Sequence, residues 1–200
     1  MSAVPRPAAF LLTGGASRRM GRPKAALLVG GEQLAARTAR LLVEAADPVI
    51  EIGPGYTNLV RVQEASPGEG PLAAIAAGWA ALTGPGAVAP SAALVVATDL
   101  PQLTAGLLRL LASSTEPGCV IPLDEAGRPQ LLCARYPAGT LARAADLVAR
   151  GRRAVLALID GQEVSRLAPV VWQAAAGRAD ALADVDTPAD LACLGGSSRT

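Results

Sequence analysis

The chain has 200 residues, a formal net charge of +1, and 51% hydrophobic but only 2% aromatic residues. The balanced charge and scarce aromatic side chains argue against a nucleic-acid partner, and no apolar run reaches the roughly 18–20 residues that a membrane span needs, so we also expect no membrane partner. Histidine is absent, which excludes Ser-His-Asp and Cys-His triads and the usual zinc sites, so catalysis would depend on carboxylates, Lys, Arg and main-chain N–H groups.

Short apolar runs alternate along the chain with segments of helical composition. This alternation predicts an α/β fold, a three-layer Rossmann-like, mainly parallel sheet with helices on both faces. The expected strands are 8–13, 48–52, 59–62, 92–97, 119–122 and 131–134, and the expected helices are 33–46, 71–82, 103–113, 138–150 and 154–159. We expect a single domain over residues 1–194 with a disordered tail at 195–200, and ligands at the carboxyl ends of the strands.

A glycine-rich segment directly follows the first expected strand and reads LTGGASRRMGRPK from Leu12 to Lys24. Glycines allow main-chain N–H groups to approach phosphate oxygens, and Arg18, Arg19 and Lys24 supply positive charge. The spacing differs from that of a P-loop, in which Lys follows the second glycine at once, and from GxGxxG. The segment predicts a phosphate-binding loop, and the alternative is an ordinary strand-to-helix turn.

This segment resembles the signature L-A/T-G-G-x-S/A-x-R-M-G-x-x-K of the molybdenum cofactor guanylyltransferases, enzymes with a nucleoside-diphospho-sugar transferase-like fold. The resemblance implies main-chain contacts from Leu12, Thr13 and Gly14 to guanine and ribose. It also implies that Gly15 approaches the triphosphate and that Lys24 is catalytic, because its charge would neutralise that of the phosphates.

A second glycine-containing segment precedes the expected helix 71–82. Gly70 and Pro71 are typical of a helix start, and plain helix initiation would explain them. The segment also resembles the family's G-P-L/M-x-G/A-I/L motif, which implies nucleotide contacts from Gly70, Pro71 and Leu72. Relatives often carry an acidic pair just upstream that contacts the nucleotide. Glu64 stands in its place, so either Glu64 makes this contact or the contact is missing.

Asp99 follows the expected strand 92–97 and precedes Leu100 and Pro101. At the carboxyl end of a strand, a carboxylate is well placed to hold Mg²⁺ together with substrate phosphates. The alternative for Asp99 is a turn or helix N-cap residue, which its combination with the glycine-rich segment disfavours. The family has an Asp-x-Pro here whose aspartate binds the metal, so the resemblance implies that Asp99 is a catalytic, nucleotide-binding and metal-binding residue.

Two later segments and the first loop contain candidate acceptor-binding residues. Residues 128–136 resemble the family's P-L-x-A-L-Y strand, which lines the acceptor side. The turn after Gly151 resembles G-x-R-R/S, which implies that Arg152 and Arg153 bind an anionic acceptor phosphate. Arg19 is a third candidate for this role, and the alternative for Arg152 and Arg153 is a solvated helix end.

Asp184 and Asp186 lie on one side of an extended segment near the C-terminus. Relatives carry N/D-x-N/D-T-P-x-D/E-L here, and the second acidic or amide residue approaches the metal or the acceptor. The resemblance therefore implies that Asp186 is a second metal ligand and an acceptor-binding residue. Capping alone would also explain the motif, with Asp186 or Thr187 as the cap and Pro188 in the first turn.

The resemblance covers residues 11–194 and implies transfer of GMP from GTP, with Mg²⁺ as cofactor, to molybdopterin that carries molybdenum, with release of pyrophosphate. A phosphate nucleophile is already ionised at neutral pH, so the absence of histidine is no obstacle. The alternatives are a cytidylyltransferase or sugar-phosphate nucleotidyltransferase of the same fold, and a non-catalytic nucleotide-binding adapter. The pair Gly14-Gly15 resembles the guanylyl branch, and intact Lys24 and Asp99 argue against an adapter.

Cys119, Cys133 and Cys193 are odd in number, far apart in the sequence and without a CxxC spacing. They suit neither a disulfide framework nor a zinc site, and they favour a reducing compartment. We therefore expect a cytoplasmic protein that uses GTP and molybdopterin, with transient cofactor-delivery proteins as a further class of partner.

Overall fold

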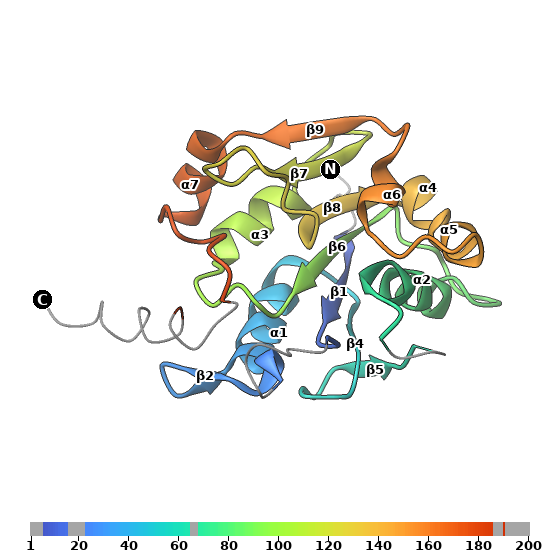
Figure 1. Ribbon diagram of the computed structural model, residues 1–200, viewed down its shortest axis with the longest axis horizontal. Coiled ribbons are helices and arrows are strands. Elements are labelled where there is room, and N and C mark those ends of the chain that lie inside the picture. The colour runs from blue at the N-terminus through green and yellow to red at the C-terminus, as the bar shows by residue number, and fades with distance from the viewer. Residues whose placement is uncertain (1–5, 16–22, 65–67, 186–189, 191–200) are drawn as a thin grey trace, which may run out of the picture.

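A seven-stranded sheet forms the centre of the computed structural model, which describes residues 6–15, 23–64, 68–185 and 190 (Figure 1). Its strand order is β5-β4-β1-β6-β8-β7-β9. The strands are β1 (Ala8–Leu12), β4 (Val49–Ile52), β5 (Val60–Val62), β6 (Ala92–Ala97), β7 (Cys119–Pro122), β8 (Cys133–Pro137) and β9 (Val164–Leu167). Every pairing is parallel except the two made by β8, which runs antiparallel to β6 and β7. The predicted mainly parallel sheet is confirmed.

The two central strands, β1 and β6, are apolar along their whole length because helices cover both of their faces. The register pairs Leu12 with Ile52 of β4 on one side and with Ala97 of β6 on the other. These three strands therefore end level with one another. The loops that follow them, which begin at Thr13, Gly53 and Thr98, leave the sheet at one edge.

Helices cover both faces of the sheet, as predicted, and each face has its own apolar core. Figure 1 shows one group, α1 (Leu34–Ala45), α3 (Ala105–Ala112) and α7 (Pro169–Ala176), on one side of the strands. The other side holds α2 (Pro71–Leu82), α4 (Ala138–Leu141), α5 (Ala144–Ala149) and α6 (Leu156–Ile159). Trp172 anchors α7 in the first core, and Trp79 of α2 packs in the second.

Some expected elements differ from those in the structure. The expected helix 138–150 is two helices, α4 and α5, and the break lies at Arg143, whose guanidinium donates to the carbonyls of Leu158 and Asp160. The expected strand 131–134 begins only at Cys133, because the two preceding residues form a turn.

Several short elements were not predicted from the sequence. A 3-10 helix η1 (Lys24–Ala26) precedes a hairpin of β2 (Leu28–Val29) and β3 (Glu32–Gln33), whose turn is made by Gly30 and Gly31, both at positive φ. A Gly-Gly pair is a known hairpin signal, so this turn could have been predicted. Strand β9 and helix α7 were also missed.

The described part of the chain contains no helix long and apolar enough to cross a membrane. Cys119 and Cys133 are free thiols, and both are buried. Cys193 and the expected tail at 195–200 lie outside the described residues.

Candidate nucleotide-binding site

The first residues after β1, Thr13 to Gly15, pass from the interior of the sheet to the surface. Thr13 still donates its N–H to the Ile52 carbonyl at 3.0 Å, and its side chain is only 6% exposed. Gly14 and Gly15 follow and are exposed, with φ at +149° for Gly15. The main chain of this loop therefore emerges at the carboxyl edge of the sheet, where ligands of open α/β sheets bind.

Gly53, the first residue after β4, lies directly against this loop. Its φ is +145°, and a Cβ at this position would lie 2.8 Å from the Gly14 nitrogen and would collide with the Thr13 hydroxyl. Only glycine allows this close approach without a shift of the backbone. The exits of β1 and β4 are therefore packed against each other.

Lys24 and Asp99, far apart in the sequence, meet at this edge. Lys24 Nζ lies 3.8 Å from Asp99 Oδ2. Asp99 is in the loop after β6, and Arg37 of α1 holds this loop by donating to the carbonyls of Pro101 and Leu103 at 3.1 and 3.3 Å. The structure thus brings together the two residues that the sequence suggested as catalytic. Arg18 and Arg19 lie outside the described residues.

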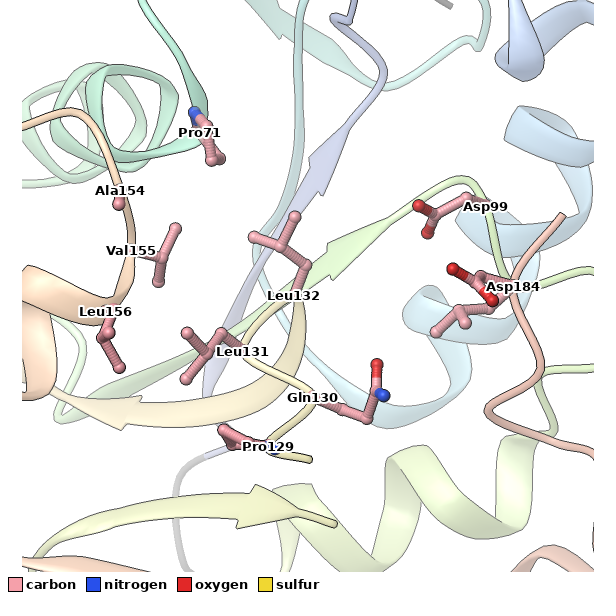
Figure 2. Close-up of a pocket in the computed structure, with 11 residues that line it drawn as sticks. Pro71, Asp99, Pro129, Gln130, Leu131, Leu132, Ala154, Val155, Leu156 and Asp184 are labelled. Carbon is pink, nitrogen blue, oxygen red and sulfur yellow. The ribbon is translucent and has the colours of Figure 1, made fainter. Parts of the chain in front are cut away.

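A pocket of about 470 Å³ opens beside Asp99 (Figure 2). Figure 2 shows Asp99 and Asp184 together on one side of it and Ala154, Val155 and Leu156 on the opposite side. The remaining lining residues, Pro71, Leu100, Pro129, Gln130, Leu131 and Leu132, complete the walls. The pocket therefore has a carboxylate side and an apolar side.

Asp184 is a site residue that the sequence analysis did not select. The N–H of Val185 donates to the Asp99 main-chain carbonyl at 2.9 Å, which fastens the C-terminal segment to the end of β6. Asp184 then lies beside Asp99 in the pocket, whereas Asp186, the residue that the resemblance pointed to, is outside the described residues. The missed signal was the first acid of the same D-x-D pair.

The donor set at this end of the pocket fits a magnesium ion. Two carboxylates, those of Asp99 and Asp184, and the amide of Gln130 line the same pocket. Nowhere among the described residues, this pocket included, do three or more acidic or cysteine side chains form a cluster that could hold a metal ion. Mg²⁺ commonly binds through one or two carboxylates with the rest of its shell from substrate phosphates and water, which such a pair would allow.

Asp124, which does not itself line the pocket, holds the Gln130 side chain. Asp124 Oδ2 accepts from Gln130 Nε2 at 3.4 Å and from Arg128 Nε at 2.7 Å, while Oδ1 accepts the N–H groups of Ala126 and Arg128. The hydrogen bond from the Arg128 N–H is the main reason that the pKa of Asp124 is below its ordinary value. Since the Gln130 amide donates to Asp124, its oxygen is the atom left to accept from a ligand or a water.

The segment at the start of α2 lies at the other end of the pocket. Gly70, with φ at +97°, precedes Pro71, which lines the pocket. Leu72 is fully buried in the core, and its N–H donates to the Arg153 carbonyl at 3.4 Å. Glu64 does not line the pocket, and its carboxylate accepts from the Gly68 N–H at 3.4 Å.

The two candidate acceptor-binding arginines flank the pocket wall but do not line it. Arg152 is exposed. The guanidinium of Arg153 donates to the Val148 carbonyl at 2.8 Å and lies 3.7 Å from the Glu69 carboxylate. The residues that follow directly, beginning with Ala154, form the apolar wall.

One charged residue was missed entirely by the sequence analysis: Glu51, which lies in the middle of β4 and is fully buried. Its Oε1 accepts from the Thr13 hydroxyl at 2.6 Å and from the N–H groups of Tyr56 and Gly55 at 2.7 and 3.1 Å. Its Oε2 accepts from the N–H and the hydroxyl of Thr57 at 2.9 and 2.7 Å. Burial raises the pKa of Glu51, but these hydrogen bonds together outweigh burial, so the pKa lies below its ordinary value.

Comparison with known proteins connects this geometry to a family. The family model described as "MobA-like NTP transferase domain" matches residues 9–168. The chain belongs to this family. The match runs from β1 to the residue after β9, so it contains Lys24, Asp99 and the residues that form most of the pocket, whereas Asp184 follows it.

Named relatives of this MobA-like NTP transferase match over most of its length. A protein of Mycolicibacterium paratuberculosis named "Probable molybdenum cofactor guanylyltransferase" is 33% identical over 94% of both chains. A protein of Opitutus terrae with the same name is 34% identical over 74% of this chain and 75% of its own.

Solved structures share the fold of this MobA-like NTP transferase at low sequence identity. Molybdopterin-guanine dinucleotide biosynthesis protein A of Archaeoglobus fulgidus superposes with a TM-score of 0.75 at 18% identity, over 94% of this chain and 96% of that one. The 2-C-methyl-D-erythritol 4-phosphate cytidylyltransferase of Thermus thermophilus has a TM-score of 0.66 at 19% identity, over 96% and 98%. The predicted nucleoside-diphospho-sugar transferase-like fold is confirmed.

Proposed function

We propose that this protein transfers GMP from GTP to molybdopterin that carries molybdenum and releases pyrophosphate. The observation that carries the proposal is that Lys24 Nζ, at the end of the glycine-rich segment, lies 3.8 Å from Asp99 Oδ2. Asp99 in turn lines a pocket large enough for a second substrate. The names of the relatives, which match over nearly the whole chain, support GTP and the molybdenum cofactor as the substrates.

The loop after β1 would bind the nucleotide with its main chain. Thr13, Gly14 and Gly15 lie at the carboxyl edge of the sheet, where main-chain groups can read guanine and ribose and approach the phosphates. Lys24, which follows the loop, would neutralise charge on the triphosphate as pyrophosphate leaves. Its present partner Asp99 would give up this ion pair when phosphate takes its place.

Mg²⁺ is the proposed cofactor, with Asp99 and Asp184 as its ligands. When bound, the metal would supply positive charge next to the α-phosphate and the leaving pyrophosphate. The Gln130 oxygen, aimed away from Asp124, would accept from water in the shell of the metal or from the acceptor.

The pocket would hold the acceptor. Its apolar residues, which include Leu131, Leu132, Val155 and Leu156, suit the flat ring system of a pterin. The reacting phosphate of the acceptor would then meet the nucleotide on the carboxylate side. The acceptor phosphate is already ionised at neutral pH, so positioning rather than proton abstraction would be the main task of these residues. Arg152 and Arg153, which directly precede the apolar wall in the chain, are candidate phosphate ligands.

A cytoplasmic location fits the two buried free thiols, and transient partner proteins would deliver molybdopterin and receive the product.

Pyrophosphate release tests the proposal. Purified protein should release pyrophosphate from GTP only when Mg²⁺ and molybdopterin are present, and the rates with CTP, ATP and UTP should be much lower. Lys24→Ala and Asp99→Asn should abolish most of this activity, whereas Glu116→Gln, at an exposed carboxylate, should retain it. A preference for CTP would contradict the guanylyl assignment, and nucleotide binding without turnover would indicate an adapter.

A further inference from the structure

Glu51 is a fully buried carboxylate at a strand position where an apolar residue would serve folding as well. Its five hydrogen-bond donors are all neutral, namely two hydroxyls and three main-chain N–H groups, so its charge has hydrogen-bond partners but no counter-charge among them. A buried carboxylate loses its hydration, and an apolar residue at the same place in a strand avoids that loss. The neighbouring residues of β4, Ile50 and Ile52, are such apolar residues.

The hydrogen bonds of Glu51 join two separate loops. One oxygen binds the Thr13 hydroxyl at the exit of β1, and both oxygens bind the turn 55–57 at the exit of β4. Gly53, which lies between Glu51 and this turn in the chain, packs so closely on Thr13 and Gly14 that a Cβ would not fit. The carboxylate therefore fixes the position of Thr13 relative to the turn, at the place where the glycine-rich loop leaves the sheet.

We propose that Glu51 is a positioning residue for nucleotide binding, holding Thr13 and the turn 55–57 as one preformed wall against which the nucleoside part of the NTP docks. This inference rests on the proposed function, because it assumes that the loop after β1 receives the nucleotide. Glu51 itself does not touch the substrate. It removes the need to order two loops when the nucleotide binds, which improves affinity.

The carboxylate is better suited to this task than the amide of a glutamine. Both oxygens of Glu51 accept from the turn, and the Oε2 partners are the N–H and the hydroxyl of Thr57. In Glu51→Gln, one of these oxygens becomes an NH₂ group that faces N–H donors and cannot accept from them. Glu51→Asp keeps the charge and both acceptors but withdraws them by one methylene.

The experiment combines steady-state kinetics, calorimetric titration of the nucleotide and amide hydrogen exchange. Glu51→Gln should raise KM and Kd for GTP about tenfold or more, as expected for loss of hydrogen bonds to a charged group, and change kcat by less than about threefold. Amides of the turn 55–57 should exchange faster than in the wild type before any nucleotide is added. Glu51→Asp should recover part of the affinity, and Glu116→Gln, at an exposed site, should behave as wild type.

Thr57→Val provides a second variant in case Glu51→Gln does not fold, because it keeps the carboxylate and removes one hydroxyl, which donates to Oε2 and accepts the Leu59 N–H at 3.2 Å. It should raise KM for GTP by a smaller factor, again with little change in kcat.

Four outcomes separate the possible failures. Faster exchange in the turn with unchanged GTP affinity would show that Glu51 is merely structural and would overturn the inference. A fall in kcat with unchanged KM would overturn it as well. If the wild type binds GTP and Glu51→Gln binds it more weakly, but neither releases pyrophosphate, the proposed function is refuted and the positioning role stands. If the wild type does not bind GTP, both are refuted.

Discussion

Lys24 and Asp99 carry opposite charges 3.8 Å apart on side chains that are 18% and 32% exposed. Water and salt weaken such a pair, and exposed ion pairs typically add only about 0–1 kcal/mol to folding stability. The fold therefore depends little on this contact. Both residues can exchange it for a phosphate or a metal at small cost, which is what a substrate site requires.

Lys24→Ala should separate activity from stability. The rate of GMP transfer should fall by about 10²–10³-fold, since one charge that stabilises the transferring phosphates is lost. The midpoint of thermal unfolding should move by no more than a few degrees, because the ion pair is partly exposed. Pyrophosphate release and circular dichroism melting measure the two effects. Large destabilisation with a matching loss of activity would instead indicate a structural lysine.

Asp184→Asn should weaken the response to magnesium. If Asp184 is the second carboxylate ligand, the Mg²⁺ concentration for half-maximal activity should rise about tenfold or more, while saturating Mg²⁺ should restore part of the rate. The titration of activity with Mg²⁺ measures this shift. Asp146→Asn, at an exposed carboxylate on α5, is the matched control. An unchanged Mg²⁺ requirement would leave Asp99 as the proposed ligand and exclude Asp184.

Individual site residues were predictable from sequence only where a local motif marked them. Lys24 follows the glycine-rich loop and Asp99 ends an apolar run, and the structure brings the two together. Glu51 had a weak signal, an acid in the apolar strand VIEI, and its role depends on a turn whose shape no local pattern shows. Gln130 lies in the segment 128–136 that the resemblance placed on the acceptor side, and Asp184 is in the D-x-D pair, but that these two residues line one pocket depends on long-range packing that no local motif shows.

At the scale of elements, those with strong patterns were predicted to their ends. Strands β6 and β7 and helix α2 have the predicted bounds, because each is a continuous apolar run or a Pro-initiated helix with clear turn signals at both ends. Strand β9 reads VSRL and lies at the edge of the sheet, where only partial burial is needed. Its pattern is correspondingly weak, and it was missed.

Glu51 joins the loops that follow β1 and β4, so the free energy of unfolding should depend on its protonation and hence on pH. Its pKa in the folded protein lies below the ordinary value of 4.5. A lowered folded pKa means that the stabilisation is fully present above about pH 4.5 and is lost as the pH falls through the folded pKa. The difference in unfolding free energy between wild type and Glu51→Gln should therefore be constant from pH 7 to pH 5 and shrink below about pH 4.5. Urea unfolding at several pH values measures it, and a difference that does not vary with pH would contradict the assignment.

Gly53→Ala should disturb the contact between the exits of β1 and β4. The added methyl group would meet Gly14 and Thr13, and φ at +145° is itself unfavourable for alanine. We expect a destabilisation of about 1–3 kcal/mol in urea unfolding together with weaker GTP binding. Gly161→Ala is the matched control, since its φ of +69° is also positive but nothing lies within 4 Å. It should lose stability without losing GTP affinity.

For the whole molecule, the reversed strand β8 determines where the pocket lies. Since β8 is antiparallel to β6, the residues before its start, 129–132, meet the end of β6 at the carboxyl edge. The overall α/β class followed from the alternation of strands and helices, but the direction of β8 did not, because a strand's orientation depends on partners distant in the sequence. The pocket was therefore not predictable, although its position at this edge was.

Nucleotide binding should stabilise the entire fold. A ligand at about 100 times its Kd adds about 2.7 kcal/mol, which corresponds to a rise in Tm of about 5–10 °C for a chain of this size. GTP with Mg²⁺ should produce such a rise in differential scanning fluorimetry, and the rise should be smaller in Glu51→Gln. Equal shifts with all four NTPs would contradict selectivity for guanine at the binding step.

The hydrogen bond from Val185 to the Asp99 carbonyl has a consequence for biosynthesis. Asp184 follows every strand of the sheet in the chain, so the sheet can be fully synthesised before this carboxylate has left the ribosome. A nascent polypeptide would carry the glycine-rich loop and Asp99 in place while one wall of the pocket is still missing. Competence for group transfer would thus arrive only after the sheet, the scaffold that supports it, has been made.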